Sequence, residues 1–126
     1  MPPVVALALV LLATSARAED WPQWRGPTRS GVWNETGIVD RFPDDGLTVT
    51  WRVPIRAGFA GPVVADGRVF VLDYQETPGT RTMDGAERLV VLDEQTGEQL
   101  WTHEWPATYR NLHVKFASGP RATPSV

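Results

Sequence analysis

The dipeptide Asp66-Gly67 constrains the fold of this chain most, because it stands between two short apolar runs. Asp-Gly favours a two-residue hairpin turn, since both central positions take a positive φ that glycine adopts freely and aspartate tolerates. The runs on either side, Pro62 to Ala65 and Arg68 to Leu72, have the composition of strands. We therefore predict two antiparallel strands joined by a tight turn.

Strand patterns also occur on both sides of this hairpin. Apolar and polar residues alternate from Leu47 to Ile55, which predicts a strand with one buried face that ends near Pro54. The run from Arg88 to Leu92 is almost continuously apolar, as in a strand covered on both faces. Between the hairpin and this run, a longer, solvated connection from Tyr74 to Gly85 is predicted by its turn-forming residues, namely Pro78, Gly79, Asp84 and Gly85.

A final strand is predicted after a tight turn. Asp93 and Thr96 can bond neighbouring backbone amides, while Gly97 supplies a positive φ. The segment Gln99 to Pro106 then places three aromatic side chains on one face, those of Trp101, His103 and Trp105. Counted from Pro62, the four strands form an antiparallel meander of the size of one propeller blade.

The beginning of the chain predicts export. Residues 1–18 contain an apolar stretch and end in Ala16-Arg17-Ala18, a small-x-small pattern typical of a signal peptide cleavage site. The apolar stretch is too short to span a membrane, so we expect cleavage before Glu19, a periplasmic or secreted protein and no membrane anchor. Residues 19–46, rich in Trp, Pro and Gly, are predicted to be an irregular strap.

Composition excludes several functional classes. The chain has no cysteine, which excludes disulfides, thiolate metal sites and a lipoprotein anchor within its 126 residues. The formal net charge of -3, without any cluster of Lys and Arg, argues against a nucleic-acid partner.

A weak internal repeat is also visible. The predicted strand around Trp51 is similar to the one around Trp101, and each is followed by small residues that lead to Pro62-Val63-Val64 or to Pro124-Ser125-Val126. Repeats of this kind are typical of propellers and other repetitive arrays.

The run from Leu92 to Trp101 resembles the repeat of the pyrroloquinoline quinone (PQQ)-like β-propellers, in the quinoprotein alcohol dehydrogenase-like superfamily: an acidic start, Thr-Gly, a polar residue and Trp. The segment Trp21 to Pro27 also looks like the leader-proximal segment of secreted members. The resemblance implies a propeller of four-stranded antiparallel blades, of which residues 47–126 are the first part and the chain an N-terminal fragment. It assigns a structural blade-docking role to four residues, Asp93, Thr96, Gly97 and Trp101.

The functional expectation is an exported, non-catalytic binding or assembly scaffold, similar more distantly to the outer-membrane assembly propeller. We assign no catalytic, cofactor-binding or metal-binding residue in this segment, and expect as partners an unidentified protein or carbohydrate and the remaining blades. The first alternative is a quinoprotein dehydrogenase that uses PQQ and calcium to oxidise an alcohol or sugar. The second alternative is a carbohydrate-binding module.

Other candidate residues favour structural roles. His103 and His113 lack the close spacing of a metal-ligand pair, and His103 is interpreted as a strand residue. Asp44 and Asp45 precede a glycine and predict a turn rather than a calcium loop.

Aromatic and guanidinium surfaces can recognise sugars, quinones and peptides, which makes the strap itself a candidate site. The preferred interpretation is that Trp21, Trp24 and Arg25 fasten the strap to the sheet.

Overall fold

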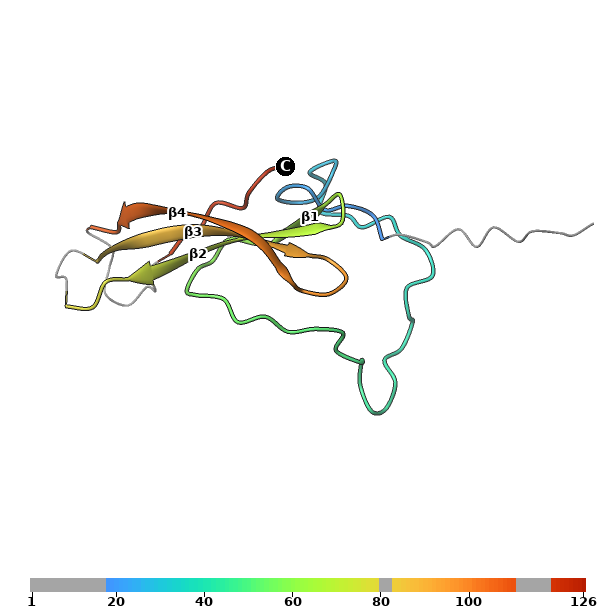
Figure 1. The fold of residues 1–126 in the computed structure, drawn as a ribbon. Coiled ribbons are helices and arrows are strands. Elements are labelled where there is room, and N and C mark those ends of the chain that lie inside the picture. The colour runs from blue at the N-terminus through green and yellow to red at the C-terminus, as the bar shows by residue number, and fades with distance from the viewer. Residues whose placement is uncertain (1–17, 80–82, 111–118) are drawn as a thin grey trace, which may run out of the picture.

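The computed structural model describes residues 18–79, 83–110 and 119–126, and within these ranges the chain is all-β. One sheet contains four strands: β1 (Val63–Ala65), β2 (Arg68–Glu76), β3 (Asp84–Asp93) and β4 (Gln99–Thr108). Each strand pairs antiparallel with the next, so the sheet is a twisted meander (Figure 1). The predicted all-β class and four-stranded meander are therefore confirmed.

The described ranges contain no helix that is long and apolar enough to cross a membrane. The predicted leader, residues 1–18, lies outside the described residues except for Ala18.

The hairpin predicted at Asp66-Gly67 joins β1 to β2. Asp66 has φ 50° and Gly67 has φ 72°, and Ala65 lies opposite Arg68 across the turn. Both turn residues thus take the left-handed conformation that a type I′ hairpin requires.

The connection predicted from Tyr74 to Gly85 is shorter than expected. Strand β2 continues to Glu76 and β3 begins at Asp84, so that Glu76 lies opposite Gly85. The strands extend into this polar sequence because backbone hydrogen bonds need no apolar side chain. Tyr74 supplies additional contacts at this end of the sheet: it is buried, and its Oη donates a hydrogen bond to the Met83 carbonyl at 2.5 Å.

Apolar side chains cover both faces of the sheet at its centre. On one face, four residues form the core cluster: Val69, Val71, Val90 and Leu92. Val63, Tyr74 and Val91 are buried on the opposite face, as strand alternation requires. The prediction that the run from Arg88 to Leu92 is covered on both faces is confirmed at its last three residues.

The prediction of a strand from Leu47 to Ile55 is wrong. These residues belong to no strand, and most of the predicted buried face is exposed, namely Leu47, Val49 and Ile55. Only Trp51 and Val53 pack against the core cluster. Two side chains of the alternating segment therefore cover a face of the sheet, while the backbone that carries them pairs with no strand.

The edge of β1 is instead occupied by the strap. The Trp21 amide donates to the Val64 carbonyl at 2.8 Å, and the Val64 amide donates to the Trp21 carbonyl at 3.0 Å. The later part of the strap and the residues after it make a wide excursion away from the sheet (Figure 1, cyan to green). Trp21 thus fastens the strap to the sheet as predicted, through its backbone amide and carbonyl.

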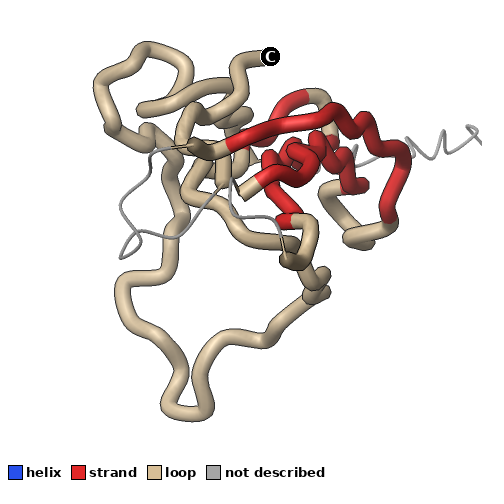
Figure 2. The backbone as a smooth tube through the Cα atoms, turned by 90° about the vertical axis from the view of Figure 1, so that its left-hand side faces the viewer, coloured by secondary structure: helices blue, strands red, loops and turns tan. Residues whose placement is uncertain are grey.

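Residues 119–126 return to the beginning of the sheet. The Phe59 amide donates to the Pro120 carbonyl at 2.8 Å, and the Val126 amide donates to the Pro22 carbonyl at 2.9 Å. In Figure 2 the C-terminus lies among loops, outside the strands. The two segments linked by the weak repeat, the approaches to Pro62 and to Pro124, are therefore neighbours in space.

Candidate functional site

The turn between β3 and β4 is organised around one carboxylate. Asp93 Oδ1 accepts hydrogen bonds from the Gln95 amide at 3.0 Å, from the Thr96 amide at 2.8 Å and from Thr96 Oγ1 at 2.9 Å. These bonds, those from Thr96 above all, hold the pKa of Asp93 below its ordinary value, because they favour the charged carboxylate. The Gly97 amide closes the turn by donating to the Asp93 carbonyl at 2.9 Å.

Trp51 packs directly on this turn. A Cβ atom built on Gly97 would lie 2.7 Å from the Trp51 ring, and Gly97 has φ 72°. The indole Nε1 of Trp51 donates to the Glu94 carbonyl at 2.9 Å. The turn therefore binds a tryptophan from a distant segment by ring contact and by one hydrogen bond. We call this arrangement the Trp51 dock: Trp51, Glu94 and Gly97.

The sequence assigned no docking role to Trp51. Its only signal was the similarity between the segment around Trp51 and the strand around Trp101. Three of the predicted docking residues, Asp93, Thr96 and Gly97, are brought together in one turn.

Trp101, the fourth predicted docking residue, lies on β4. It stands opposite Val91 in the register and is 46% exposed. β4 pairs with β3 alone among the strands of the described sheet, so its other edge is open there. The docking role of Trp101 remains a prediction.

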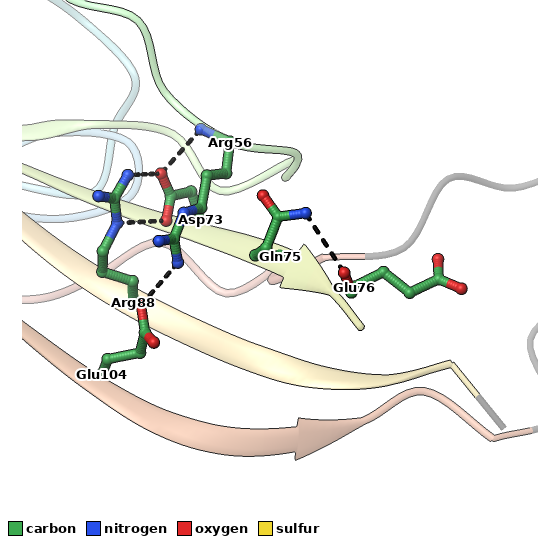
Figure 3. Close-up of polar contacts among 6 residues, drawn as sticks. All are labelled: Arg56, Asp73, Gln75, Glu76, Arg88 and Glu104. Carbon is green, nitrogen blue, oxygen red and sulfur yellow. Dashed lines mark hydrogen bonds and ion pairs between the residues drawn. The ribbon is translucent and has the colours of Figure 1, made fainter. Parts of the chain in front are cut away.

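A ladder of charges crosses the same face of the sheet as the core cluster. Asp73 on β2 is fully buried and lies opposite Arg88 on β3, which lies opposite Glu104 on β4. Arg88 holds Asp73 in a forked pair, Nε to Oδ1 at 3.0 Å and Nη2 to Oδ2 at 2.6 Å (Figure 3). The bond to Asp73 raises the pKa of Arg88, so the guanidinium stays charged.

Arg56 connects this charge ladder to the chain that precedes the sheet. Its backbone amide donates to Asp73 Oδ2 at 2.8 Å, and its Nη1 pairs with Glu104 Oε2 at 2.6 Å. Asp73 therefore contacts both Arg88 and the Arg56 backbone, as Figure 3 shows. A carboxylate fully engaged in this way serves as a structural clamp.

A second polar cluster lies on the opposite face, around Glu87. Trp105 Nε1 donates to Glu87 Oε2 at 3.0 Å, and Tyr109 Oη bonds to Glu87 Oε1. The rings of Tyr74 and Tyr109 meet edge to face with centroids 4.8 Å apart. Burial, followed by the contact with Glu87, raises the pKa of Tyr109, and burial raises the pKa of Tyr74.

The remaining candidates are placed as follows. His103 lies on β4 as predicted, with its ring centroid 5.7 Å from that of Trp105, whereas His113 lies outside the described residues. The Gly46 amide donates to the Pro43 carbonyl at 2.9 Å, which makes the Asp44-Asp45 segment a turn. Within the described ranges, no three His, Asp or Glu residues are grouped so that they could hold a metal ion.

Trp24 and Arg25 do not share the anchoring role of Trp21. Trp24 is 67% exposed, and the Arg25 guanidinium carbon lies 5.5 Å from the centre of the Trp24 ring.

Comparison with known proteins gives no match: no family model, no curated protein and no solved structure is significantly similar to this chain.

Proposed function

We propose that this chain is the first part of an exported PQQ-like β-propeller that acts as a binding or assembly scaffold. The Trp51 dock is the observation that carries the proposal. It joins a segment before the sheet to the Thr96-Gly97 turn within the sheet by ring contact and a hydrogen bond at 2.9 Å. Repeated units joined in this way form an array in which each unit stabilises its neighbour.

The position of Trp101 suits a similar dock on a following unit. Trp101 occupies the place in its segment that Trp51 occupies in the earlier one, and its indole is half exposed on β4, the edge strand of the described sheet. A tryptophan side chain that becomes buried removes about 150–250 Å² from water. We therefore propose that Trp101 docks on a Thr-Gly-type turn of a following blade.

The contacts of two acidic side chains, Asp73 and Glu87, favour a scaffold role over catalysis. The Asp73 carboxylate accepts hydrogen bonds from Arg88 and from the Arg56 backbone amide. The Glu87 carboxylate is hydrogen-bonded to Trp105 and Tyr109. These carboxylates stabilise the sheet in the arrangement described. The quinoprotein dehydrogenase that uses PQQ and calcium remains the alternative function.

Two measurements on the full-length protein test the proposal. Trp101→Ala should lower the free energy of unfolding by about 3–5 kcal/mol if the indole is buried between blades. A loss below about 1 kcal/mol would contradict docking, because a half-exposed tryptophan loses little on truncation. Trp33→Ala is the matched control, since Trp33 lies in the strap and is similarly exposed, at 51%.

The dehydrogenase alternative is tested by adding PQQ and calcium and following dye reduction with alcohols and sugars as electron donors. The scaffold proposal predicts no turnover with any of them. Turnover that depends on both PQQ and calcium would contradict the scaffold proposal and support the dehydrogenase.

A further inference from the structure

Three segments that are distant in the sequence line an open surface pocket of about 610 Å³. Its walls contain two aromatic rings, one guanidinium and one hydroxyl, and the residues that line it are Trp24, Phe59, Gly61, Arg121, Ala122 and Thr123. None of these residues is acidic. Pockets with this mixture of apolar surface and a few directed polar groups are typical of small-ligand sites.

The loop that carries Trp24 is held in one conformation by its own hydrogen bonds. The Gly31 amide donates to the Arg25 carbonyl at 2.9 Å, and Arg25 Nη2 donates to the Ser30 carbonyl at 3.0 Å. Arg29 Nε donates to Gln23 Oε1 at 3.0 Å. Arg25 and Arg29 both take a positive φ, at 66° and 57°, which is uncommon for residues other than glycine. The loop is therefore ordered in a strained form while its tryptophan stays exposed.

The opposite wall is also fixed by backbone packing. The Phe59 amide donates to the Pro120 carbonyl at 2.8 Å. Gly119, with φ 126°, lies so close to Gly58 that a Cβ atom on Gly119 would be 2.8 Å from the Gly58 Cα. This contact sets the spacing between the segments that carry Phe59 and Arg121. Preorganised walls reduce the entropy that a ligand must overcome on binding.

Arg121 supplies the charge of the pocket. Its guanidinium carbon lies 5.4 Å from the centre of the Phe59 ring. Within the part of the chain that the structure describes, the Arg121 guanidinium has no hydrogen-bonded or ionic partner. Its planar N–H groups can therefore receive a carboxylate in a forked geometry.

From these observations we propose that the pocket binds a carboxylated saccharide, such as a short oligomer of uronic acid. A guanidinium lies over one face of each aromatic ring, Arg25 over Trp24 and Arg121 over Phe59. The exposed remainder of both rings stands at the pocket and matches the flat apolar face of a pyranose ring. Thr123 supplies a hydroxyl for the sugar hydroxyls, and Arg121 pairs with the carboxylate. This inference does not depend on propeller closure, because all three segments belong to the described chain.

The test is a calorimetric titration of the full-length protein with trigalacturonate. Its fully methyl-esterified form serves as the neutral probe of the same shape. The proposal predicts binding of trigalacturonate and at least tenfold weaker binding of the ester, since the ester cannot form the charged pair with Arg121. Equal binding of both probes would overturn the role of the carboxylate. Failure of both to bind would overturn the site.

Variants then locate the site. Arg121→Gln should weaken trigalacturonate binding at least tenfold and leave binding of the ester unchanged, whereas Trp24→Ala should weaken both. Arg41→Gln and Trp33→Ala are the matched controls, because both side chains are exposed elsewhere on the chain. Trp24→Phe, which keeps a ring, should retain most of the affinity and covers the case in which the alanine variant does not fold.

Benzoate distinguishes a saccharide from a simple aromatic acid. Tighter binding of benzoate than of trigalacturonate would overturn the saccharide assignment. The outcome is separate from that of the scaffold proposal, which is tested by the stability of the Trp101 variant and by dye reduction.

Discussion

Trp51 lies so close over Gly97 that no other residue type fits at position 97 without moving the indole. A Cβ atom there would approach the ring to 2.7 Å, far inside van der Waals contact. This steric requirement for glycine adds to a second one: the positive φ of Gly97, 72°, by itself disfavours a side chain. Gly97 is therefore required twice, by its backbone conformation and by its contact.

Gly97→Ala should destabilise the protein by about 2–5 kcal/mol, from about 1–2 kcal/mol of left-handed strain and about 1–3 kcal/mol of overpacking against Trp51. Urea unfolding measures the change. Gly37→Ala is the control, because Gly37 has φ 79° and nothing within 4 Å of its added Cβ. Equal losses at both positions would show that the ring contact contributes nothing.

Trp51→Phe should lower the free energy of unfolding, because the smaller ring buries less area and the Glu94 carbonyl loses the hydrogen bond from Nε1. The lost hydrogen bond should account for about 1 kcal/mol of the decrease. The ring of phenylalanine keeps the contact with Gly97. Thermal unfolding of the variant, compared with Trp33→Phe at an exposed site, isolates the effect. A variant as stable as the parent would mean that water replaces the indole donor without cost.

Asp73→Asn should be among the most destabilising single changes, at about 3–5 kcal/mol, because it removes the charge from the forked, buried pair with Arg88. Asp44→Asn removes the surface pair with Arg41, whose side chains are almost fully exposed, and should change stability by less than about 0.5 kcal/mol. Chemical unfolding of both variants makes the comparison. Similar small losses would mean that the forked pair adds little.

The turn at Asp93 should loosen in acid. A carboxylate whose pKa is lowered in the folded state stabilises the fold above its unfolded pKa of about 4, and this contribution disappears as the pH falls through the lower, folded value. The amide signal of Thr96, followed by NMR as the pH is lowered, should shift with the titration of Asp93. Asp93→Asn should abolish this shift; a shift that persists in the variant would assign it to another group.

The two tyrosines of the chain should ionise above the ordinary tyrosine pKa of about 10. A raised pKa means that the neutral phenols stabilise the fold up to about pH 10, and that the contribution is lost as the pH rises through the folded values. Ultraviolet absorbance of tyrosinate measures the titration. Glu87→Gln should lower the pKa of Tyr109 toward the ordinary value. A titration already centred near pH 10 in the parent would contradict the burial of both rings.

Local chemistry determined much of the sheet. Asp66-Gly67 specifies its turn because both residues accept a positive φ, and the apolar run to Leu92 predicts a strand with two covered faces. The Asp93-Thr96-Gly97 turn was equally readable, because its hydrogen bonds join residues within a few positions of each other. Such features need no knowledge of distant segments.

Tertiary structure decided where the side chains between the strap and the sheet go. The alternation from Leu47 to Ile55 predicted a strand, yet Trp21 occupies the edge of β1, and the segment contributes Trp51 and Val53 to a face of the sheet. The pocket between Trp24, Phe59 and Arg121 was likewise not predictable, since its three segments meet only after the chain has folded. The physical reason is the same in both cases: a periodic pattern reports only the local spacing of apolar side chains, whereas long-range packing selects which of them are covered and by which partner.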